Sequence, residues 1–190
     1  MTKPENTTVT NLDPISKESL LRLSESIVDQ IDIIESADEQ TELHKVHKAS
    51  KKLHHIGDEL LDLRQVAQGD DLTYINFMLG SVCYQLGYLE KSKEAYEAAL
   101  IDWPDHVGLL NEYFLALTDL GDLPKAYEVI LLSIKHGGET PDVLQNMATV
   151  LARMGRIAEA KAVLFNCMSK FPDDIQSQQL LAELDNNFTP

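Results

Sequence analysis

A glycine recurs every 34 residues in the second half of the chain, at Gly87, Gly121 and Gly155. Each of them tolerates the backbone conformation that ends one helix and turns the chain into the next. Self-similarity at such a period is typical of repeat proteins, in which each unit buries its apolar face only against its neighbours. The spacing therefore predicts three stacked helix-turn-helix units over roughly residues 73 to 185.

Four further columns of residues keep the same spacing. Two of them hold mostly small side chains, which let two helix axes approach closely, and a third holds large apolar residues that fill the space between hairpins. The columns are Gly80, Phe114, Ala148 and Ala182; Ser92, Ala126 and Ala160; Tyr96, Ile130 and Leu164; and Ala99, Ser133 and Cys167. A helix breaker closes each unit, at Pro104, Gly138 and Pro172.

These columns resemble the tetratricopeptide repeat family, whose unit is a helix-turn-helix of the same period. The family's small-residue, aromatic and proline columns match Gly80, Tyr96, Ala99, Pro104, Ala126, Ala148, Ala160 and Pro172. The chain departs from the family at the tryptophan-like column, which holds Asn76, Leu110 and Leu144, and at Phe114 and Gly138. We expect the second unit to pack with an altered tilt because both Phe114 and Gly138 belong to it.

The segment before the repeats has helical periodicity as well. Two apolar stripes follow the spacing of a helix face, Leu20, Leu23, Ile27, Ile31 and Ile34, then Val46, Ala49, Leu53, Ile56, Leu60 and Leu63. One interpretation of the second stripe is an antiparallel hairpin that caps the array. The other is a seam that pairs with a second subunit and forms a homodimer. The residues leave both open.

The fold expected from these patterns is all-α. It is a tetratricopeptide-type α-solenoid of three helical hairpins plus a C-terminal capping helix, preceded by an N-terminal helical hairpin. The expected segments are a disordered tail (1–13), the N-terminal hairpin (14–68), three repeats (73–106, 107–140 and 141–174) and the capping helix (175–186).

The charge of the chain argues against two classes of partner. Lysine and arginine number 16 against 31 aspartates and glutamates, a formal net charge of -15, which repels nucleic acid and an anionic membrane surface. We see no secretory signal and no apolar run long enough to cross a bilayer. Cys83 and Cys167 fall on helical positions that we expect to face inward, as thiols in a reducing cytoplasm.

The sequence offers little that predicts chemistry. His44 and His47 share a helix face, but Lys45, Lys48 and nearby lysines would repel a cation, so we expect no metal site. We find no phosphate-binding loop and no recognisable set of nucleophile, base and acid. The sequence therefore predicts a non-enzyme without a cofactor.

What remains is surface. In a stack of hairpins the first helices line a continuous concave face. The repeat register places on that face Tyr74, Phe77, Met78, Ser81, Tyr84, Asn111, Leu115, Gln145, Asn146 and Arg153. Aromatic and apolar residues at one end and amides at the other suit a partner peptide, and the negative charge favours a basic or apolar segment. The competing interpretation is that Phe77 and Met78 pack against the N-terminal hairpin.

One subset of the family grips the C-terminal carboxylate of its partners with Lys, Asn and Arg on the first helices. Here Phe77 and Ser81 occupy the corresponding positions of the first unit, so the resemblance does not imply such a clamp.

Three functions fit these observations. The first is a cytoplasmic adaptor or chaperone-like scaffold that binds a peptide in the concave face. The second is a type III secretion translocator chaperone, which the chain resembles in size, acidity and architecture but in no quotable motif. The third is a structural or oligomerisation subunit whose groove is filled by its own N-terminal helices.

Overall fold

The computed structural model describes residues 15–38 and 42–187 and is all-helical over them. The tail for which disorder was predicted, residues 1–13, lies outside the described residues. The helices are α1 (Lys17–Ser36), α2 (Leu43–Arg64), α3 (Gly69–Gln85), α4 (Leu89–Leu100), α5 (Val107–Leu120), α6 (Leu123–Lys135), α7 (Pro141–Arg153), α8 (Ile157–Lys170) and α9 (Ile175–Asn187).

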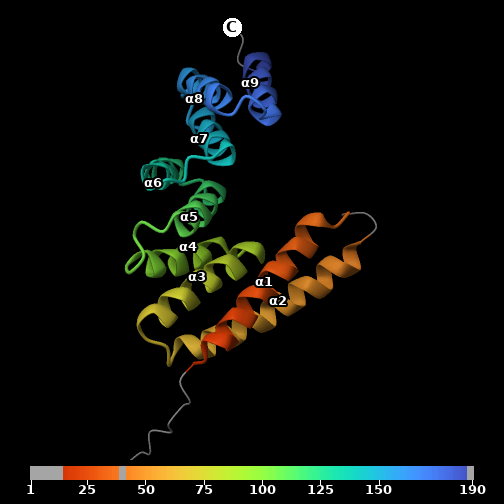
Figure 1. Ribbon diagram of the computed structural model, residues 1–190. Coiled ribbons are helices and arrows are strands. Elements are labelled where there is room, and N and C mark those ends of the chain that lie inside the picture. Colours follow the sequence, from red (N-terminus) through yellow and green to blue (C-terminus); the bar gives the residue numbers. More distant parts are fainter. Residues whose placement is uncertain (1–14, 39–41, 188–190) are drawn as a thin grey trace, which may run out of the picture.

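The helices stack in chain order as hairpins, from α1–α2 at one end to α9 at the other (Figure 1). Three of these hairpins, α3–α4, α5–α6 and α7–α8, are the repeats, and the expected all-α solenoid with an N-terminal hairpin and a terminal helix is confirmed. Toward the preceding hairpin, α3 packs mainly on α2 and more lightly on α1, as α5 does on α4 and α3. The N-terminal hairpin therefore sits in the stack as one more unit.

The recurrent glycines end the first helix of each repeat by one mechanism. Gly87, Gly121 and Gly155 have φ of 77°, 81° and 76°, the left-handed region that side chains disfavour. The residue after each glycine donates its N–H to the carbonyl five positions before that residue, from Tyr88 to Cys83 at 2.8 Å in the first repeat. This is the Schellman motif, which satisfies the last carbonyls of a helix. The 34-residue spacing seen in the sequence is therefore the distance along the chain between successive turns of this kind.

The small-residue columns meet across each hairpin. A Cβ on Gly80 would overlap the ring of Tyr96, which is fully buried against α3. Ser92 Oγ donates to the carbonyl of Gly80 at 2.9 Å, so the close approach also satisfies a buried hydroxyl. Any side chain at Gly80 would force α3 and α4 apart.

Helix starts in the later repeats are set by capping side chains. The ring of His106 accepts from the N–H of Leu109 at 3.0 Å at the start of α5. Thr140 Oγ1 accepts from Val143 N–H at 3.3 Å at the start of α7. Both contacts satisfy donors that have no partner within the helix. Helices α5 and α7 thus begin directly after a residue whose side chain caps them.

The core runs along the whole stack in three connected clusters. The first joins α1, α2 and α3 through residues such as Leu23, Leu53 and Leu79. The second is centred on α5, and the third holds α8 and α9 against α7. Cys167 is buried and Cys83 half-buried, both as free thiols. In the described part of the chain, no helix is long and apolar enough to cross a membrane.

Candidate functional site

The first helices of the hairpins form the inner wall of the stack. Helix α1 contacts α3, α3 contacts α5, and α7 contacts α9, whereas the described second helices α2, α4, α6 and α8 make no comparable contacts with one another. A stack whose units approach more closely on one side curves toward that side. By this criterion the first helices line the concave side at the α1–α3, α3–α5 and α7–α9 junctions, while the second and third repeats are joined mainly through α6 and α7.

Helix α3 presents one side chain per turn to this face. Tyr74, Phe77, Ser81 and Tyr84 are half-buried, so each keeps part of its surface open. Met78 is only 4% exposed, because it packs into the cluster that α3 shares with α1 and α2. Met78 thus offers no surface to a partner, in agreement with the competing interpretation for that residue.

An unbroken chain of aromatic rings leads from α3 into the loop between α4 and α5. Tyr74 lies 6.2 Å from Trp103, Trp103 stacks on His106 at 5.3 Å, and His106 lies 5.9 Å from Phe77, measured between ring centroids. Phe77 then contacts Tyr96 at 6.3 Å. These contacts fix the orientation of the half-buried rings.

Three carboxylates surround Tyr84 in the middle of the face. The Tyr84 hydroxyl donates to Asp119 Oδ2 at 2.7 Å, and burial together with the charges of Asp119, Glu112 and Glu35 raises the pKa of Tyr84. Burial, assisted by Glu35, also raises the pKa of Glu112, although a hydrogen bond from Tyr96 opposes the shift. Among the described residues no lysine or arginine forms an ion pair with Glu35, Glu112 or Asp119. The field here attracts a cation.

The polar residues predicted on α5 and α7 are partly engaged in the fold. Ser133 Oγ donates to Asn111 Oδ1 at 2.6 Å. Gln145 is 5% exposed because its amide donates to Asp174 at 2.9 Å and faces Ser177 at the start of α9. Gln145 therefore belongs to the joint with α9, while Asn146 and Leu115 stay half-buried.

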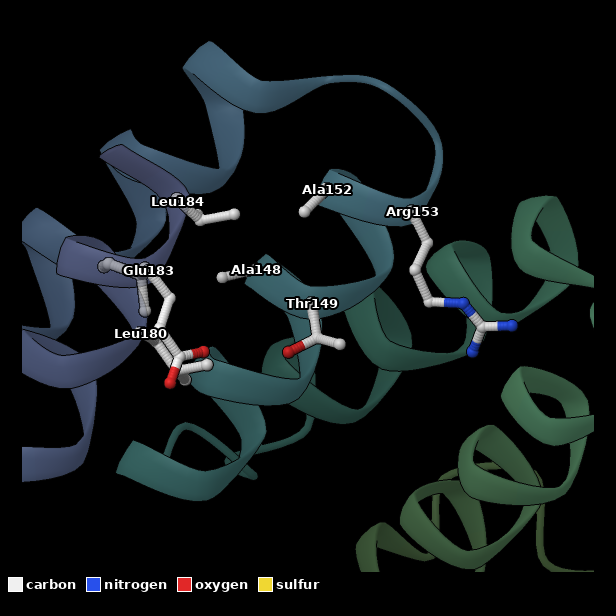
Figure 2. A pocket seen from close by; sticks show the side chains of 8 residues that line it. Ala148, Thr149, Ala152, Arg153, Leu180, Glu183 and Leu184 are labelled. Carbon is white, nitrogen blue, oxygen red and sulfur yellow. The ribbon is translucent and has the colours of Figure 1, made fainter. Parts of the chain in front are cut away.

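Arg153 lies at the C-terminal end of the face and is exposed. Its Nη1 donates to the carbonyl of Thr118 on α5 at 3.0 Å, and Figure 2 shows Arg153 among the residues that line a pocket beside α7. That pocket, of about 270 Å³, lies between α7 and α9, with apolar walls from Ala148, Ala152 and Leu184. Of the predicted residues, Met78 and Gln145 are thus buried within the fold, and Arg153 links α7 to α5.

Some residues of the face were missed by the sequence reasoning. Helix α1 runs alongside α3, with Leu21 near Tyr74 and Glu35 near Tyr84. Leu21 and Val28 are 57% and 54% exposed, and the spacing of seven that links them to each other and to Glu35 places all three on one side of α1. This second stripe beside the buried one was the available signal. The contributions of Trp103 and His106 from the loop had no periodic signal.

Comparison with known proteins finds a family model that matches one repeat and solved structures with a similar fold. Residues 73–100 match the tetratricopeptide repeat model, and no curated protein matches the chain. The structure is similar to a crystal structure of MamA (TM-score 0.67, 11% identity, covering 75% of this chain and 82% of that one). It is also similar to YrrB, described as a TPR protein with an unusual peptide-binding site (TM-score 0.63, 13% identity, covering 85% and 84%). The family model thus matches the first repeat, and the fold along the stack is that of tetratricopeptide repeat proteins.

Proposed function

We propose that the protein is a protein-interaction scaffold that binds a basic and apolar peptide segment of a partner along its concave face. The observation that carries the proposal is the coincidence, on one wall, of open apolar side chains with carboxylates that have no cationic partner among the described residues. Leu21, Val28 and Leu115 supply the apolar contacts, and Glu35 and Asp119 the charge. The role is that of an adaptor or a chaperone-like module without chemistry of its own.

The electrostatics favour one sign of partner. Glu35, Glu112 and Asp119 lie close enough together to raise the pKa of Tyr84, and a cationic side chain placed among them would relieve their mutual repulsion. Aromatic rings fixed by their neighbours offer contact area at low entropic cost. An acidic segment would meet repulsion at the same place, which gives the face specificity as well as affinity.

The similar structures add support of a limited kind. YrrB, which has the same fold, is described as having a peptide-binding site. Identities of 11% and 13% carry the fold alone, so the chemistry of the partner proposed here comes from this chain's own residues.

A second candidate is the structural subunit, which one observation favours. Helix α1 covers Met78 and forms the first part of the inner wall, so the N-terminal hairpin already occupies surface that would otherwise be open. In that case Leu21 and Val28 on α1 would serve contacts between copies, including a homodimer. Sedimentation of the full chain tests this directly: a monomer at micromolar concentration would contradict it. A role as a secretion chaperone rests on overall architecture only.

The peptide-binding proposal is tested with a fluorescein-labelled peptide of alternating arginine and leucine and a matched peptide of alternating glutamate and leucine. We expect anisotropy to rise and saturate with the basic peptide only. The double variant Glu35→Gln, Asp119→Asn should weaken this binding by roughly three- to tenfold, because two unpaired charges are lost.

The control is the double variant Glu90→Gln, Glu128→Gln, which removes the same charge from the second helices α4 and α6 on the opposite side. It should bind like the parent chain. Equal weakening by both double variants would reduce the effect to net charge and contradict a site on the concave face. Saturable binding of the acidic peptide would contradict the assigned partner chemistry.

A further inference from the structure

A cavity of about 260 Å³ lies at the N-terminal edge of the concave face, between the start of α1, the start of α3 and the loop that follows α4. Its walls combine two kinds of group. Tyr74 and Trp103 supply aromatic rings inclined at 46° to each other, and Leu20 and Leu21 close the apolar side. The surface of the cavity is mostly apolar, and Asp70 and Asp71, in the first turn of α3, line it together with Lys17 at the start of α1.

Aromatic faces beside carboxylates form an environment suited to an organic cation. The negative face of each ring attracts the cation, and tryptophan does so most strongly. The carboxylates add a Coulombic term that an apolar ligand would not use. In the described part of the chain, neither Asp70 nor Asp71 forms an ion pair, and the two cation–π contacts lie elsewhere, at Tyr88 and Tyr127.

The walls are held in place before any ligand arrives. Trp103 stacks on His106 at an interplanar angle of 21°, and His106 is fixed as the cap of α5 by the N–H of Leu109. Thr73 Oγ1 donates to Asp102 at 2.8 Å, which ties the loop next to Trp103 to α3. A cavity with pre-ordered rings loses little entropy on binding.

We propose that this cavity receives the guanidinium or ammonium group of an arginine or lysine side chain of the bound partner. The assignment rests on the proposed function, because the cavity opens beside Tyr74, the first residue of the concave line on α3. It adds a defined anchor for a basic residue at one end of the groove. Lys17 also lines the cavity, but among the described residues it forms no ion pair with Asp70 or Asp71.

Trp103 is the one tryptophan of the sequence, so its fluorescence reports on this cavity directly. The probe is Nα-acetyl-arginine amide, and the matched control is Nα-acetyl-citrulline amide, which has nearly the same shape without the charge. We expect a saturable change in Trp103 emission with the arginine derivative and a much weaker one with the citrulline derivative. The indole N–H signal in a proton–nitrogen correlation spectrum should shift in parallel.

The double variant Asp70→Asn, Asp71→Asn should weaken binding of the arginine derivative about fivefold or more. Asp173 is exposed in the distant loop between α8 and α9, so Asp173→Asn should leave this binding unchanged. Circular dichroism confirms that each variant is folded. Equal responses to arginine and citrulline, an unaffected double variant, or no change in either Trp103 signal would each overturn the assignment. If the arginine derivative binds but the arginine–leucine peptide does not, the proposed function of the concave face is wrong. If the peptide binds but the arginine derivative does not, the assignment of this cavity is wrong.

Discussion

Single residues decide where this stack deviates from the tetratricopeptide repeat pattern. Asn76 occupies the column that holds buried leucines, Leu110 and Leu144, in the next two repeats. It is 5% exposed, and its Oδ1 is the one buried side-chain polar atom of the described residues without a hydrogen-bond partner. A buried acceptor without a donor costs stability, whereas an apolar group of similar size does not.

Asn76→Leu should therefore raise the free energy of unfolding by about 1–2 kcal/mol, the usual cost of an unsatisfied buried group. Urea denaturation followed by circular dichroism measures it. Asn76→Asp is the matched opposite and should destabilise strongly, because it buries a charge. A fall in stability for the leucine variant would mean that the amide is satisfied in solution.

Glu112 gives the stability a dependence on pH whose sign follows from its environment. Burial raises the pKa of this carboxyl in the folded protein above its ordinary value of 4.5. As pH rises past 4.5 the unfolded chain loses this proton first, so the group favours unfolding increasingly until the folded form also ionises. Glu112→Gln, which keeps an acceptor for Tyr96, should raise the melting temperature at pH 7. That gain should shrink below pH 4.5; a gain independent of pH would contradict this account.

At the scale of the element, the turn that closes each first helix is the unit of recurrence. The sequence showed it clearly, because a left-handed residue followed by a Schellman bond demands glycine at a fixed place. The small-residue columns were equally readable, since Gly80 faces Tyr96 directly. The loop after α4 was not readable: Trp103 and His106 contribute to the site through ring contacts that no spacing encodes.

Gly121→Ala should destabilise the protein by about 1–2 kcal/mol, the cost of a left-handed conformation for a residue with a Cβ. Its φ is 81° and no neighbour lies near the added atom, so the effect is one of backbone strain alone. Gly57→Ala makes the same chemical change inside α2, where the new Cβ would lie 3.4 Å from Val82, an ordinary contact. It should stabilise by up to about 1 kcal/mol. Thermal melts of both variants give the comparison, and equal signs would contradict it.

At the scale of the whole molecule, the repeat register predicted the solenoid and the terminal helix, and two apolar stripes predicted the N-terminal helices. The site was predicted less completely. Register places a side chain on a face, but it does not show which neighbours cover it, and so Met78 and Gln145 were assigned to a surface that α1, α2 and α9 bury. The part played by α1 was invisible because its role depends on how a segment outside the repeats docks.

The hydrogen bonds from Tyr84 to Asp119 and from Arg153 to Thr118 each link one hairpin to another across the concave side. Each bond therefore restrains the angle between two neighbouring hairpins. If the cation of the proposed partner draws Asp119 away from Tyr84, one of these two links is lost, and the angle between the first two repeats is then free to change. In that case the curvature of the stack depends on whether its concave face is occupied.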